Sequence, residues 1–87
     1  MSDREVQGFR DAITAIDRGI FDAINRRLEL VAELKRYKAA NGIAFVDPDR
    51  ESAMVDERVA ENRGPLSPDG LRRFYLELLE LVKRELD

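Results

Sequence analysis

Apolar residues recur at helical spacing through the first part of the chain, marking one face of a helix. The stripe consists of Val6, Phe9, Ile13, Ile16, Ile20, Ile24, Val31 and Leu34. Asn41-Gly42 follows it and is a typical helix stop, because glycine readily adopts the backbone conformation that ends a helix. The pattern predicts a first helix over residues 4–40.

Two shorter helices follow, and each begins with a capping residue and a proline. Asp47-Pro48 and Ser67-Pro68 both combine a side chain that can accept an N-cap hydrogen bond with proline at the first helical position. These signals predict helices over residues 48–62 and 68–86. The expected fold class is therefore all-α, a single domain of three helices over residues 1–87.

The first helix is too long for the others to cover. At 1.5 Å per residue it extends for roughly 54 Å, whereas a compact chain of this length has a radius of gyration near ~12 Å. Its apolar stripe continues along most of that length. We therefore expect it to pack against a second copy of the chain in a homodimer, most simply with two-fold symmetry.

Composition excludes several classes of chemistry. The chain has no histidine and no cysteine, so it offers no disulfide, no thiolate nucleophile, no ordinary zinc site and no Ser-His pair. We expect no metal and no cofactor. The net charge of -3 does not favour nucleic acid or an anionic membrane surface. There is neither an apolar run of about 18 residues nor the apolar core of a signal peptide, so the expected location is the cytoplasm.

Two cationic residues occupy the apolar stripe. Arg27 and Lys38 continue its spacing, about 20° apart around the helix and about 16 Å apart along it. Two readings stay open: they bind one small ligand between them, or their charges extend past the apolar surface into water. Arg10 lies about 25 Å from Arg27 along the helix and about 100° around it. It can join the others only from an antiparallel partner helix, and otherwise it is a surface charge.

The start of the second helix carries more charge than capping requires. Three of its residues need no functional explanation: Asp47 is a good N-cap, Pro48 suits the first helical position, and Asp49 is favourable near the positive end of the helix dipole. Arg50 is unfavourable in a first turn, and Glu51 shares a face with apolar residues, so we expect its carboxylate to point inward. Arg50 and Glu51 are therefore candidates for a site.

Taken together, these positions resemble the all-helical (AroQ-type) chorismate mutases. The resemblance extends from Phe9-Arg10 through the third helix and includes Arg26-Arg27, Lys35–Lys38 and the Asp47–Glu51 run. It implies an intertwined homodimer whose long first helices pair and whose sites each take one arginine, here Arg10, from the partner subunit. The implied substrate is chorismate, which an isomerase of aromatic amino-acid biosynthesis converts to prephenate.

The resemblance also implies roles for individual residues. Arg27 binds a substrate carboxylate, and Lys38 donates to the ether oxygen and contacts a carboxylate. Arg50 binds the region of the enolpyruvyl carboxylate, while Asp47 and Glu51 face the ring hydroxyl. No nucleophile, metal or obligatory proton transfer is needed, because the enzyme holds the compact conformer and stabilises charge on the ether oxygen.

The third helix departs from the family pattern. The family places a small polar residue and then a glutamine or glutamate near the ether oxygen, whereas a gapless alignment puts Val82 and Leu86 there. Glu85 is one residue away and can substitute if the register shifts and it is protonated. Some small family members gain activity by binding the first enzyme of the shikimate pathway, so such a partner is possible.

Two other functions stay open. An isochorismate pyruvate lyase has the same fold and similar cations but eliminates pyruvate. The complete Asp47–Glu51 element after a long connector favours the mutase. A non-catalytic helical dimer or regulatory module is the third possibility, in which Arg27 and Lys38 only specify the register of the helices.

Overall fold

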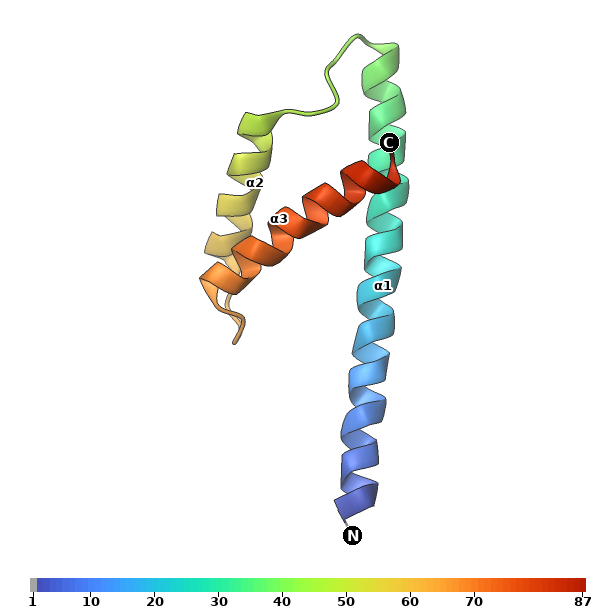
Figure 1. Cartoon of the computed structure of the whole chain (residues 1–87), viewed down its shortest axis with the longest axis vertical. Helices are drawn as coiled ribbons and strands as arrows, with labels where there is room; N and C mark the ends of the chain where they lie inside the picture. The colour runs from blue at the N-terminus through green and yellow to red at the C-terminus, as the bar shows by residue number, and fades with distance from the viewer. Residues whose placement is uncertain (1) are drawn as a thin grey trace.

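The structure is a computed structural model that describes residues 2–87, and these residues form three helices and no strand (Figure 1). Helix α1 runs over Ser2–Ala40, α2 over Pro48–Glu61 and α3 over Pro68–Glu85. The predicted bounds differ by two residues at the start of α1 and by one at the ends of α2 and α3. The predicted all-α class with three helices is confirmed.

The helix ends use the capping groups that the sequence indicates. An Asp47 side-chain oxygen accepts a hydrogen bond from the Arg50 backbone N–H at 3.1 Å, and Ser67 Oγ accepts one from the Gly70 N–H at 2.9 Å. At the end of α1, Gly42 has a φ of 67°. The Ile43 N–H then donates to the Lys38 carbonyl at 2.9 Å, as in a Schellman-type helix end. The chain direction at each end is therefore determined locally.

The three helices make an elongated molecule. Its principal extents are 62 × 25 × 18 Å, and its radius of gyration is 17.0 Å, well above the ~12 Å of a compact chain of this length. Figure 1 shows α2 and α3 beside the C-terminal half of α1, while the N-terminal half projects away from them. Helix α3 contacts both α2 and α1. The connector from α1 to α2 closes one end of this arrangement.

The single chain has a small core. Val55, Leu79 and Val82 are buried, with 3%, 7% and 4% of their surfaces exposed. By contrast, the apolar stripe on the N-terminal half of α1 is exposed, and Phe9 retains 72% of its surface. No other segment of residues 2–87 covers this stripe, so burial of its apolar surface would require another molecule.

Helix α1 exceeds the thickness of a bilayer without having the composition of a membrane span. Its 39 residues extend for about 58 Å. Charged residues are distributed along it, and none of the helices formed by residues 2–87 combines the length and apolar character needed to cross a membrane.

Candidate active site

A cavity of about 270 Å³ lies between the C-terminal half of α1, the connector, α2 and α3. This volume is near the lower end of small-molecule sites, roughly 300–1,000 Å³. The polar residues that line it are Arg27, Lys38, Asp47, Arg50, Glu51 and Lys83. Its apolar wall includes Val31, Leu34, Met54, Leu79 and Val82. It is the size of a site for one small, highly charged molecule.

Most of the residues selected from the sequence meet at this cavity. The cavity is lined by Arg27 and Lys38 from α1, by Asp47, Arg50 and Glu51 at the start of α2, and by Val82 from α3. Arg10, Glu85 and Leu86 do not line it in the single chain. Arg10 and Glu85 are exposed, and Leu86 caps the end of α3, where its carbonyl accepts a hydrogen bond from Lys35. The structure thus assembles one wall from α1 and another from α2 and α3.

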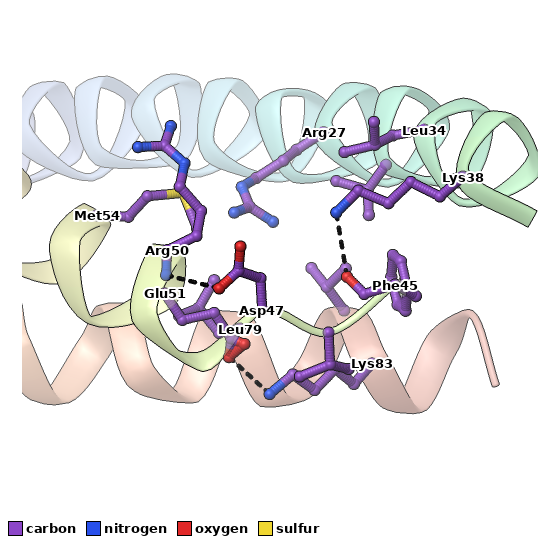
Figure 2. A pocket seen from close by; sticks show the side chains of 13 residues that line it. Arg27, Leu34, Lys38, Phe45, Asp47, Arg50, Glu51, Met54, Leu79 and Lys83 are labelled. Atoms are coloured by element: carbon purple, nitrogen blue, oxygen red, sulfur yellow. Dashed lines mark hydrogen bonds and ion pairs between the residues drawn. The ribbon is translucent and has the colours of Figure 1, made fainter. Parts of the chain in front are cut away.

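On the α1 side, two cationic side chains point into the cavity (Figure 2). The guanidinium carbon of Arg27 lies 5.9 Å from the centre of the Tyr75 ring, within the range of a cation–π contact. Lys38 Nζ donates to the Phe45 carbonyl at 3.2 Å. Both side chains are half-buried. Their contacts therefore orient both charges before any ligand arrives.

The first turn of α2 contributes groups of both signs. The Asp47 carboxylate caps the helix and also borders the cavity, where Figure 2 draws it on the side facing Arg27. Arg50 forms an ion pair with Glu57 at 3.7 Å and is 56% exposed. Such an exposed pair contributes little to stability. The Arg50 guanidinium is therefore free to exchange Glu57 for an anionic ligand at small cost.

Lys83 on α3 also lines the cavity, and it was not among the residues predicted from the sequence. Its Nζ donates to Glu51 Oε1 at 2.7 Å and to Glu80 Oε1 at 3.3 Å. The hydrogen bond that Lys83 donates to Glu51 raises the pKa of Lys83 above its ordinary value, with burial acting in the opposite direction. A signal was present: Leu79, Val82 and Lys83 stand at i, i+3 and i+4. Lys83 is thus a charged residue within the apolar face of its helix, as Arg27 and Lys38 are in α1.

The cavity has a positive balance although the chain as a whole has a net charge of -3. Arg27, Lys38, Arg50 and Lys83 provide four cations, and Asp47 and Glu51 provide two carboxylates. The sum is +2. Local cations determine the potential that a ligand meets. Guanidinium and ammonium groups form charge-assisted hydrogen bonds with carboxylates. The arrangement is suited to a small dicarboxylate.

Comparison with known proteins agrees with this geometry. Residues 9–85 match the family model described as chorismate mutase type II. The structure of a chorismate mutase from Thermus thermophilus superposes with a TM-score of 0.86 at 28% identity, covering 90% of this chain and 98% of that one.

Two curated relatives differ in length. The T-protein of Enterobacter agglomerans is 37% identical over 78 residues, which are 84% of this chain but 21% of that protein. The chain thus spans about a fifth of that relative. The 4-amino-4-deoxychorismate mutase of Streptomyces venezuelae is 32% identical over 82 residues, covering 94% of this chain and 77% of that protein. On the family match and this nearly full-length similarity, the chain belongs to the chorismate mutase type II family.

Proposed function

We propose that the protein is a chorismate mutase that rearranges chorismate to prephenate in aromatic amino-acid biosynthesis. The observation that carries the proposal is the cavity in which Arg27, Lys38 and Arg50 meet. The reaction is a concerted [3,3] shift: the ether C–O bond breaks while a new C–C bond forms within one molecule. It therefore requires positioning and electrostatic stabilisation rather than a nucleophile.

Lys38 is the proposed donor to the ether oxygen. An ammonium group has three N–H donors, and Lys38 uses one of them on the Phe45 carbonyl. That bond fixes the position of Nζ and leaves two donors for the substrate. Negative charge develops on the ether oxygen as its bond to carbon lengthens. A fixed cationic donor stabilises the transition state more than the ground state for that reason.

The arginines are proposed to select the reactive conformer. Arg27 binds one carboxylate from the α1 side, and Arg50 binds the enolpyruvyl carboxylate from α2. Binding both carboxylates of the substrate holds its two reacting carbons close together, which lowers the entropic part of the barrier. Asp47 and Glu51 are proposed to face the ring hydroxyl, whose single O–H donates to Glu51. Arg27 and Lys38 are half-buried, which supports their proposed contacts with the substrate, since burial limits the competition from water for their charges.

A two-fold dimer is proposed to complete each site. The exposed apolar stripe of α1 supports an interface with a second copy, and Arg10 lies on the same projecting half of the helix. We propose that the partner subunit's Arg10 enters the cavity and contacts a substrate carboxylate. The resulting sites would each contain groups from both chains.

Product analysis tests the proposed function. Purified protein given chorismate is expected to yield prephenate and no pyruvate. Release of pyruvate from isochorismate would instead identify the lyase reaction. Inertness toward both substrates would contradict the proposal and favour a non-catalytic dimer. Repeating the assay with the first enzyme of the shikimate pathway tests whether a partner enzyme raises the activity.

The relative from Streptomyces venezuelae supports a second candidate. Its name specifies 4-amino-4-deoxychorismate, in which an amine replaces the ring hydroxyl, and it matches this chain nearly end to end. Family membership alone therefore does not separate the two substrates. The choice depends on the groups around the ring substituent.

A further inference from the structure

The Lys83–Glu51 pair is the most enclosed ion pair formed by residues 2–87. Its side chains are 32% and 22% exposed. Each of the other ion pairs in this part of the chain includes a side chain at least 50% exposed. The 2.7 Å distance between Lys83 Nζ and Glu51 Oε1 is that of a charge-assisted hydrogen bond. Figure 2 draws the pair on the side of the cavity opposite Arg27 and Lys38.

The pair changes what Glu51 can bind. A carboxylate can accept about four hydrogen bonds, and Lys83 uses one of the Glu51 sites. The remaining sites can accept from an uncharged hydroxyl. A ligand ammonium bound to the same carboxylate would be less favourable than a hydroxyl, because it would lie close to the Lys83 ammonium, which has a charge of the same sign. In a partly enclosed cavity this repulsion is only weakly screened.

Lys83 also sets the charge of the cavity. Without Lys83, the net charge of the cavity would be +1 instead of +2. Three cations (Arg27, Lys38 and Arg50) would then face two carboxylates (Asp47 and Glu51). A dicarboxylate with a ring hydroxyl has a net charge of about -2, whereas the analogue with a ring ammonium has a net charge of about -1. Both the local repulsion and the total charge therefore oppose the ammonium.

We propose that Lys83 is a specificity-determining residue that selects a dicarboxylate with a neutral ring hydroxyl over one with a ring ammonium. The inference rests on the proposed function, and it deepens that function by choosing between its two substrate candidates. Lys83 acts through Glu51: it neutralises the carboxylate that would otherwise attract an amine.

The test compares kcat/KM for chorismate and 4-amino-4-deoxychorismate. Three proteins are measured: wild type, Lys83→Met and, as a matched loss of one charge on exposed α3 surface, Arg84→Met. Because like charges juxtaposed in a site are strongly unfavourable, the wild type is expected to prefer chorismate by about 100-fold or more. Lys83→Met is expected to reduce that preference at least about tenfold, since Glu51 becomes free to pair with the ammonium. Arg84→Met is expected to keep the preference within about twofold.

Further measurements separate failure of this inference from failure of the proposed function. If the wild type turns over neither compound, the proposed function is wrong. The preference between the hydroxyl and the amine compound is then measured from their dissociation constants by calorimetry. An equal preference in wild type and Lys83→Met would overturn the role of Lys83, as would a wild type that binds neither compound or favours the amine. Lys83→Gln, which removes the charge but can still donate to Glu51, replaces Lys83→Met if circular dichroism shows that the latter does not fold.

Discussion

Mixing two inactive variants tests whether each site takes Arg10 from one subunit and Arg27 from the other. The two residues lie 17 positions apart on one continuous helix, which corresponds to about 25 Å. Arg10 is exposed and does not line the cavity of its own chain. Arg10→Ala and Arg27→Ala would each remove one guanidinium from both sites of a homodimer. Each is expected to lose about 10²–10³ in rate.

The geometry determines how much activity returns on mixing. In a heterodimer, one site combines the intact Arg27 of the first chain with the partner's intact Arg10. The other site lacks both. Random exchange of equal amounts makes half of the dimers heterodimers, so about 25% of the wild-type activity is expected from a two-fold dimer with shared sites. Either variant alone would have about 1% or less.

The assay measures chorismate consumption before and after subunit exchange, and native mass spectrometry measures the fraction of heterodimers. A matched control mixes Arg10→Ala with the Arg10→Ala/Arg27→Ala double variant, which can assemble no intact site and is expected to stay inactive. Heterodimers without recovered activity would refute the shared site. Full activity of Arg10→Ala alone would refute the role of Arg10.

Three further results are expected. Ile16→Asp places a charge in the exposed α1 stripe and is expected to convert the proposed dimer to monomer by analytical ultracentrifugation, whereas Arg18→Ala is expected to leave it a dimer. A dimeric Ile16→Asp would contradict the proposed interface. The raised pKa of Lys83 contributes stability that is present below its unfolded value of 10.5 and lost as pH rises through the higher folded value. Glu51→Gln should reduce this alkaline component in urea unfolding curves, because it removes the largest cause of the raised pKa and leaves the contribution of Glu80. Val82→Ala, at a site 4% exposed, is expected to lower the free energy of unfolding by about 2 kcal/mol, and a loss under about 0.5 kcal/mol would contradict its place in the core.

The helices were predictable because their signals are local. The spacing of the α1 stripe, the caps at Asp47 and Ser67 and the stop at Gly42 depend on neighbouring residues, and each has the expected backbone role. Arg27 and Lys38 could be found in the same way. Both interrupt a regular apolar pattern, so the sequence itself indicates that their environment is unusual.

The α3 wall of the cavity was harder to predict because it depends on how that helix is rotated and where it ends. Val82 and Lys83 face the cavity. Glu85 lies about 200° around the helix from Lys83 and is exposed. Leu86 shares the direction of Val82 to within about 40°, but it lies at the helix cap, where its carbonyl accepts from Lys35. Packing between distant segments determines how α3 is rotated and where it ends, and the only local indication is the charge of Lys83 within an apolar face. The roles proposed for Glu85 and Leu86 stay predictions.

The most direct test of the proposed catalysis is kcat for chorismate in the wild type and in Lys38→Gln. Glutamine can still donate to the Phe45 carbonyl but has no positive charge for the ether oxygen. Arg36→Gln serves as control, because Arg36 is an exposed cation on the same turn of α1. We expect a fall in kcat of about 10²–10³ for Lys38→Gln and little change for Arg36→Gln. A Lys38→Gln enzyme with wild-type kcat, or a wild type that forms no prephenate, would contradict the account.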